Sequence, residues 1–288
     1  MNLWYLYFLL PVILFPLAAT INVANGRKIG SQKASMYRQL TLTIIWSPVI
    51  FLLIEKWELI QKHFWLLLLC GLLWAIYLSA SFYAMNLTSV WISRSFVTVS
   101  RTLSAFIIWY TLFSESIGWY DFFGIWVIFL GFALFYKVFE QNFSVSDLIW
   151  ITISLIWWVI FSPNTLVFKT FAIDFPGIEA AYLLESSSVL FLIAWQLIRH
   201  KWSLRKSFSI DQKNLSLLFL TAPLILIASY GLAKSVHIIP FYIFNTLFVL
   251  SLVISIILSW IFLWEKFTLR QASALWTMIL WCAIVVVL

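Results

Sequence analysis

The chain has 288 residues, of which 64% are hydrophobic and only 10% are charged, and its formal net charge is +7. Soluble domains carry about 25% charged residues, so this composition excludes a soluble globular protein and makes lipid the solvent for most of the apolar surface. The positive charge does not indicate nucleic-acid binding, because the basic residues lie in short segments between apolar runs, where they orient a membrane protein.

The apolar runs predict an all-α integral membrane protein. A helix that crosses a bilayer needs about 20 mostly apolar residues, and its backbone groups must bond internally because the hydrocarbon holds no water. The first run lacks a basic start and exceeds the apolar core of a signal peptide, about 7–15 residues, so we expect it to be retained. The segment from 203 to 214 is expected to be a loop with room for a short surface helix. In chain order the ten predicted spans are 3–24, 35–54, 64–84, 88–113, 119–138, 147–169, 179–198, 214–234, 237–263 and 268–288.

Several matches at nearly one offset predict an internal repeat. The matches are Pro16 with Pro163 and Tyr83 with Tyr230, each 147 residues apart, and Glu115 with Glu265, which are 150 residues apart. The halves 1–140 and 141–288 would each contain five spans. Because five is odd, the second half must enter the membrane from the opposite side. Such inverted repeats are typical of alternating-access transporters.

Loop charges predict the orientation. One side of the predicted topology collects Arg27, Lys28, Lys33, Arg38, Lys137, Arg199, Lys201, Arg205, Lys206, Lys213, Lys266 and Arg270. The other side holds Lys56, Lys62, Lys169 and Lys234. The more basic side is expected in the cytoplasm, which turns both termini outward. We therefore expect an integral protein of the bacterial cytoplasmic (inner) membrane.

The sequence resembles the drug/metabolite transporter superfamily, specifically its EamA-type members. The resemblance depends on the five-plus-five arrangement, on a glutamate after spans four and nine, in "LFSE" (112–115) and "FLWE" (262–265), and on Arg38 near the start of span two. The family pattern has a glycine before that glutamate, and here it is missing twice. The resemblance covers nearly the whole chain and implies a ten-helix transporter, with spans five and ten peripheral to a central cavity. The family moves amino acids, metabolites, nucleotide sugars and cationic drugs, so the resemblance implies transport without a substrate.

Span four contains two arginines, Arg94 and Arg101. They are seven residues apart, so they differ by only about 20° around a helix and share a face with Thr98. An arginine at the bilayer centre costs about 2.5–3.5 kcal/mol, so we expect the charge to be used. We predict that Arg101, helped by Arg94, clamps a carboxylate or phosphate of a substrate. The alternative is that they snorkel or brace a neighbouring helix through its carbonyl groups.

Glu185 is the clearest carboxylate inside a predicted span, and Tyr182 precedes it by about one helical turn. Two interpretations remain open. Glu185 either neutralises an arginine in a buried ion pair or binds a proton or a substrate ammonium group. Pro16 and Pro163 are expected either to break their helices and free carbonyl groups or, the favoured interpretation, to kink them. Further candidates for substrate binding, with interface anchoring as the alternative for the aromatic ones, are Trp74, Tyr77, Asn164 and Tyr230.

Together these features predict a secondary transporter that moves a small polar metabolite by alternating access, with an amino acid or another carboxylate or zwitterion favoured. The alternative is a flippase or transporter of a lipid phosphate or a quaternary ammonium compound. The chain has no G-x-x-x-x-G-K-[ST] loop and no histidine-based catalytic motif, so we expect neither ATP use nor an enzyme. Cys70 and Cys282 have no zinc spacing, and no metal or cofactor is expected. The expected partners are the substrate, a coupling proton and membrane lipid, without nucleic acid, and the expected state is a monomer.

Overall fold

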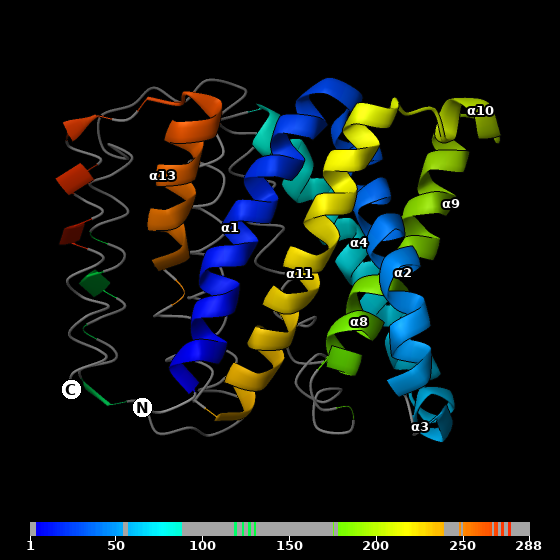
Figure 1. Cartoon of the computed structure of the whole chain (residues 1–288), viewed down its shortest axis with the longest axis horizontal. Helices are drawn as coiled ribbons and strands as arrows, with labels where there is room; N and C mark the ends of the chain where they lie inside the picture. The colour runs from blue at the N-terminus through cyan, green and yellow to red at the C-terminus, as the bar shows by residue number, and fades with distance from the viewer. Residues whose placement is uncertain are drawn as a thin grey trace.

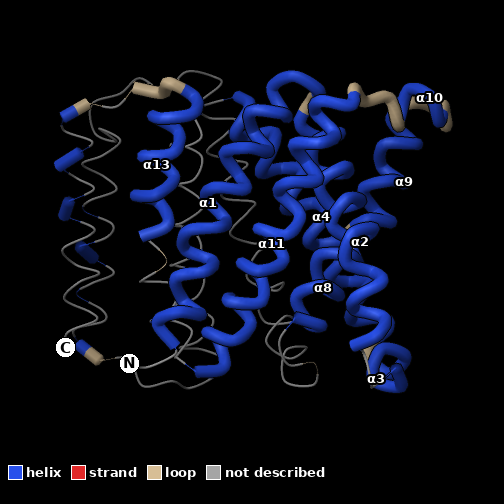
Figure 2. Tube along the Cα trace, in the orientation of Figure 1, coloured by secondary structure: helices blue, strands red, loops and turns tan. Residues whose placement is uncertain are grey.

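The structure is a computed structural model. It describes residues 4–53, 57–87, 178–238 and 250–266, with single positions at 118, 119, 123, 126, 127, 130, 175, 248, 268, 269, 272, 273, 276 and 277. Within this part of the chain the only regular secondary structure is helix (Figures 1 and 2). The helices are α1 (Trp4–Ile29), α2 (Ser31–Leu53), α3 (Trp57–Lys62), α4 (Phe64–Leu87), α8 (Ile178–Ser187), α9 (Val189–Arg199), α10 (Leu204–Ser207), α11 (Gln212–Ile238) and α13 (Leu250–Leu263).

The prediction of an all-α protein with helices that could cross a membrane is confirmed for the described residues. Among the described residues, four segments are long and apolar enough to cross a bilayer: Leu6–Ile29, Phe64–Asn86, Ile178–Arg199 and Gln212–Ser235. Each matches a predicted span, because a bilayer-length apolar run leaves its backbone few alternatives to a helix. The predicted spans 88–113 and 147–169 lie outside the described residues.

The helix ends correct the predicted boundaries. The first helix continues to Ile29, five residues past the expected end, and α2 begins at Ser31 rather than at residue 35. Pro16 does not break α1, and its carbonyl accepts a hydrogen bond of 2.9 Å from the Thr20 hydroxyl. Its counterpart Pro163 lies outside the described residues.

Three further features adjust the predicted elements. The seventh span comprises α8 and α9, which join at Ser188, a residue whose backbone dihedrals remain helical. The short helix α10 lies in the segment where a surface helix was expected. The helix α3, between the second and third spans, was not predicted.

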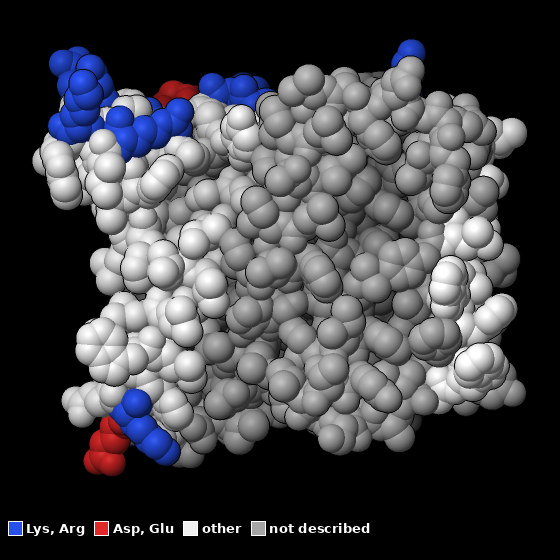
Figure 3. All heavy atoms as spheres, turned by 180° about the vertical axis from the view of Figure 1, so that it is seen from behind, with Lys and Arg blue, Asp and Glu red and all other residues white. Residues whose placement is uncertain are grey.

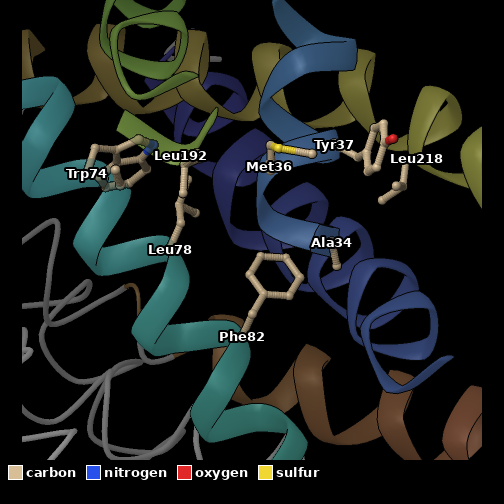
Figure 4. Close-up of a cluster of buried hydrophobic side chains, with 9 residues drawn as sticks. Ala34, Met36, Tyr37, Trp74, Leu78, Phe82, Leu192 and Leu218 are labelled. Atoms are coloured by element: carbon tan, nitrogen blue, oxygen red, sulfur yellow. The ribbon is translucent and has the colours of Figure 1, made fainter. Parts of the chain in front are cut away.

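The long helices pack side by side as an upright bundle (Figure 1). The first helix contacts α11 and α13, and α2 contacts α4, α8, α9 and α11. A buried apolar cluster joins α2, α4, α9 and α11 (Figure 4), in which Phe82, Leu78 and Trp74 of α4 lie near Leu192 of α9 and Met36 of α2. This interior holds the polar site described below between helices from both halves of the chain.

Positive charge gathers at one end of the bundle (Figure 3). The helix ends that meet there carry Arg27, Lys28, Lys33, Arg199, Lys201, Arg205, Lys206, Lys213 and Lys266. The described cations toward the opposite end are Lys62 and Lys234. Arg38, which was counted with the loop charges, was wrongly placed, because it lies inside α2 and is only 5% exposed.

Asp211 caps α11 at this basic end, outside the membrane-spanning segment. Its carboxylate accepts the backbone N–H of Asn214 at 3.2 Å and a hydrogen bond from the Asn214 side-chain amide. The side-chain hydrogen bond from Asn214, the backbone hydrogen bonds and the nearby positive charge of Lys28 lower the pKa of the Asp211 carboxyl below its ordinary value. Such a cap satisfies donors that the first turn of a helix leaves free.

We therefore expect Asp211→Ala to lower the Tm of the solubilised protein at neutral pH. A lowered folded-state pKa stabilises the fold above the unfolded-state pKa, and this contribution is lost as pH falls through the folded-state pKa. The difference in Tm between wild type and variant should therefore shrink on acidification below the ordinary aspartate range. A difference that stays constant across that pH range would contradict the capping role.

Candidate functional site

The candidate site is a group of polar residues around Glu185, which is fully buried on α8. Its Oε2 accepts hydrogen bonds from Gln39 Nε2 at 2.8 Å and from Trp74 Nε1 at 2.9 Å. Its Oε1 accepts one from the Ser229 hydroxyl at 3.1 Å. Arg38 Nη2 lies 3.4 Å from Oε2 and forms an ion pair. We call these five residues, Arg38, Gln39, Trp74, Glu185 and Ser229, the Glu185 cluster.

Four helices bring the cluster together. Arg38 and Gln39 come from α2, Trp74 from α4, Glu185 from α8 and Ser229 from α11. These helices otherwise bury apolar side chains against each other, so the cluster is a charged point inside an apolar interior. A buried charge is tolerated when it is paired and hydrogen-bonded, as Glu185 is here.

Three serines at the junction of α8 and α9 follow Glu185 directly. The hydroxyls of Ser186, Ser187 and Ser188 each donate to the carbonyl three residues earlier, at 3.4, 2.8 and 2.8 Å. Local bonds of this kind compete with helix continuation. Gln39 Nε2 also lies 2.7 Å from the Glu185 carbonyl oxygen and 2.9 Å from Ser188 Oγ, so the two hydrogens of this amide serve both the carboxylate and the α8–α9 junction.

Two atoms of the cluster keep unused hydrogen-bonding capacity. Within the described residues, Arg38 Nη1 and Gln39 Oε1 are buried and have no hydrogen-bond partner. Unsatisfied polar atoms inside an apolar bundle are costly, so each calls for an explanation. Arg38 Nη1 can therefore still donate a hydrogen bond, and Gln39 Oε1 can still accept one. The negative charge of Glu185 is balanced by Arg38.

The aromatic candidates divide into two groups. Trp74 contacts Glu185 directly, and Tyr77 stacks on Trp74 with ring centroids 4.3 Å apart. Tyr182 instead shares a 2.7 Å hydrogen bond with Ser47 of α2. Tyr230 packs edge-to-face on Tyr7 of α1, with centroids 5.9 Å apart, and Lys234 Nζ lies 6.0 Å from its ring centroid. The structure therefore brings Trp74 to Glu185, stacks Tyr77 on Trp74, and gives Tyr182 and Tyr230 other partners.

Four of the predicted site residues, Arg94, Thr98, Arg101 and Asn164, lie outside the described residues. Sequence reasoning missed Gln39, Ser188 and Ser229 as parts of the site and treated Arg38 as a loop charge. One signal was present in the sequence. Arg38 and Glu185 are 147 residues apart, the offset already read from the two prolines and the two tyrosines.

Glu265, expected as an end-of-span residue, lies just beyond α13 and pairs with Arg27 at 2.7 Å. The Arg27 side chain is 37% exposed, so this pair lies at the surface and links the ends of α13 and α1. Cys70 is buried with a free thiol.

Comparison with known proteins gives the fold. No family model matches the chain, and no curated protein matches it. A solved structure described as "Crystal structure of protein" is similar with a TM-score of 0.72 and 14% sequence identity, over 99% of this chain and 97% of that chain. At this identity the similarity concerns architecture alone, and it extends over nearly the full length of both chains.

Proposed function

We propose that this chain is a secondary transporter that moves a small polar metabolite across the bacterial cytoplasmic membrane by alternating access. The observation that carries the proposal is the Glu185 cluster, a buried ion pair with unused hydrogen-bonding capacity inside an apolar helical bundle. Ionisable residues at such positions are expensive, face the bundle interior and mark substrate or ion pathways. The resemblance to EamA-type transporters points to the same activity.

The proposed architecture is two inverted halves, 1–140 and 141–288, with five spans each. Two helix matches support it. Adding 147 to the residue numbers of α2 (Ser31–Leu53) gives 178–200, and α8 and α9 together occupy 178–199. Moving α4 (Phe64–Leu87) by the same offset gives 211–234, and α11 occupies 212–238. By this correspondence Arg38 and Glu185 stand at equivalent positions of the two halves.

That equivalence suggests how the halves move. In an inverted repeat, the outward- and inward-facing states interconvert when the halves exchange conformations. When the halves exchange conformations, a contact between two equivalent positions is replaced by a contact between the same two residues, so it is kept. We therefore expect the Arg38–Glu185 pair to persist in both states, as a contact between the halves that does not change.

Contacts between non-equivalent positions should change. The counterpart of the Trp74–Glu185 bond would join Thr221 and Arg38. Thr221 now donates to Leu218 O at 2.8 Å and to Asn22 Oδ1 at 3.1 Å. In the opposite state we expect the Thr221 hydroxyl to accept from Arg38 Nη1, the donor that lacks a partner in this state.

The substrate class we favour is a carboxylate or zwitterion such as an amino acid. Arg101, helped by Arg94, would clamp the carboxylate, because a guanidinium group matches its two oxygens. The basic end of the bundle would face the cytoplasm, with nine described cations there against Lys62 and Lys234 toward the other end.

Uptake into proteoliposomes tests the proposal. We expect one class in a radiolabelled panel of amino acids, organic phosphates and quaternary amines to accumulate above protein-free vesicles. Arg101→Ala should lower this uptake at least about tenfold, because hydrogen bonds to a charged group contribute about 1.5–3 kcal/mol. Arg27→Gln, at the surface pair, should retain uptake. No uptake of any class would reject transport, and unchanged uptake by folded Arg101→Ala would reject the clamp.

The same assay tests the exchange of partners at Arg38. Thr221→Val should slow uptake because the opposite state loses its expected partner of Arg38, and it should also lower Tm modestly because it removes the Thr221–Asn22 hydrogen bond of this state. Thr20→Val is the matched control, since Thr20 is also a buried helical threonine that donates to its own helix. Equal effects of the two substitutions would reject the exchange and leave transport itself intact.

A further inference from the structure

The basic end of the bundle is uneven, and one corner groups four cations that form no ion pair with a described acidic residue. The segment Arg199–Ile210, between α9 and α11, contains Arg199, Lys201, Arg205 and Lys206 and no acidic residue. All four of these side chains are exposed. Elsewhere at this end Arg27 pairs with Glu265, and Lys33 binds the hydroxyl and carbonyl of Ser209. Four exposed cations therefore lie close together in this segment, where Figure 3 shows a dense group of basic side chains.

Apolar side chains adjoin the same four cations. Trp202 is 70% exposed and Leu204 is 65% exposed, both within the basic segment. Trp195 and Ile198 are exposed on the last turns of α9 and continue the lipid-facing surface toward Trp202. Tryptophan is enriched where hydrocarbon meets headgroups, because its ring is apolar and its N–H is polar. We therefore expect the cations to lie at the depth of the phosphate groups of a surrounding bilayer.

The backbone fixes this corner in an unfavourable conformation. Lys201 and Trp202 have φ values of 51° and 62°, in the left-handed region that non-glycine residues rarely adopt. Their N–H groups cap α9 by donating to Ile198 O at 3.0 Å and Leu197 O at 2.7 Å. The buried Ser207 hydroxyl donates to Ser203 O at 2.9 Å and Gln196 O at 3.3 Å, which holds α10 against α9. Such strain persists where the surroundings determine it and is common at binding sites.

We propose that Arg199, Lys201, Arg205 and Lys206 form a binding surface for the headgroups of anionic phospholipids, with Trp202 and Leu204 inserted among the adjoining acyl chains. Clustered cations beside a membrane span attract anionic lipid, and a fixed arrangement loses little entropy on binding. Arg199 is already oriented by a hydrogen bond to the Gln32 side chain of α2. A lipid on this surface would therefore contact the segment that joins α9 to α11 and would also reach α2. This inference does not depend on the proposed transport activity.

The test compares two variants that remove equal charge from the same end. The corner variant is Arg199→Gln/Lys201→Gln/Arg205→Gln/Lys206→Gln, and the control variant is Lys28→Gln/Lys33→Gln/Lys213→Gln/Lys266→Gln. Each protein is placed in phosphatidylcholine nanodiscs containing increasing fractions of phosphatidylglycerol, and Tm is followed. We expect phosphatidylglycerol to raise the Tm of wild type and of the control variant. The corner variant should need at least about tenfold more phosphatidylglycerol for the same rise, since each juxtamembrane cation contributes about fivefold to binding.

Three results would overturn the proposal: a wild type that does not respond to phosphatidylglycerol, an equal loss of response in both variants, or an equal rise in Tm when inorganic phosphate is added to pure phosphatidylcholine discs. The second would indicate diffuse electrostatics, and the third would indicate a site for free phosphate. If the corner variant does not fold, Arg205→Gln and Lys206→Gln are tested singly, with native mass spectrometry counting retained phosphatidylglycerol. Fewer bound lipids than in Lys213→Gln would support the proposal, and equal numbers would overturn it.

Discussion

Glu185→Leu is expected to lower the free energy of unfolding by about 3–5 kcal/mol, the cost of removing one partner of a buried ion pair. The substitution leaves the Arg38 guanidinium without its carboxylate at a site where the residue is only 5% exposed. It also removes the acceptor of the Trp74 N–H and of one hydrogen bond from Gln39. Chemical unfolding of the protein in detergent micelles measures the change.

A double-mutant cycle separates the ion pair from these other losses. The variant Arg38→Leu/Glu185→Leu removes both charges, so it should be less destabilised than the sum of the single variants by about 0.5–3 kcal/mol. Replacing both members of a buried pair by apolar residues often costs little, because desolvation opposes the attraction of the pair. The orphaned Trp74 and Gln39 donors remain in the double variant, so we do not expect full recovery.

The chain contains its own control in the Arg27–Glu265 pair. Its atoms are closer, at 2.7 Å against 3.4 Å for Arg38 and Glu185, yet the Arg27 side chain is 37% exposed. Water and salt screen such a pair, so a cycle with Arg27→Gln and Glu265→Gln should give about 0.2–1 kcal/mol. A coupling at the surface pair equal to or above that of the buried pair would contradict the importance of burial.

The sequence predicted the long helices well because a bilayer restricts them strongly. An apolar run of about 20 residues has no other stable way to satisfy its backbone in hydrocarbon. The positions of α1, α4 and α11 follow from this requirement alone. The contacts at the α8–α9 junction do not, because they depend on three serine hydroxyls and on Gln39, which lies 149 residues before Ser188 in the chain.

The candidate site was harder to predict for a related physical reason. A helix that is apolar on both its lipid-facing and its interior-facing sides carries little pattern to show which side is buried. Glu185 was recognised because a carboxylate within a span is rare, but its partner was not. Arg38 was counted with the loop charges because it lies only three residues inside the predicted second span, 35–54, whereas α2 begins at Ser31 and places Arg38 seven residues inside the helix. The equal offset of Arg38 and Glu185 in the two halves is the sequence feature that would have joined them.

Gly71→Ala and Gly231→Ala are each expected to destabilise the bundle, by about 1–3 kcal/mol, although alanine favours helices. A Cβ at Gly71 of α4 would clash with the Ser187 carbonyl oxygen of α8. A Cβ at Gly231 of α11 would lie 2.6 Å from the Tyr7 carbonyl oxygen of α1 and 2.8 Å from Pro11 Cδ. These close neighbours include backbone atoms, which cannot move aside without shifting a whole helix. Small residues allow this approach between membrane helices.

Gly26→Ala is the matched control, because Gly26 also lies inside a long helix. Its added Cβ would meet Ala34, Asn86 and Phe82 at 3.5–3.6 Å, which is ordinary van der Waals contact. Without a clash, the helix preference of alanine should make this variant as stable as wild type or more stable, by up to about 1 kcal/mol. Unfolding in detergent micelles compares the three variants. Equal stability changes at all three glycines would contradict the close helix contacts, since only Gly71 and Gly231 place a new methyl group against the backbone of another helix.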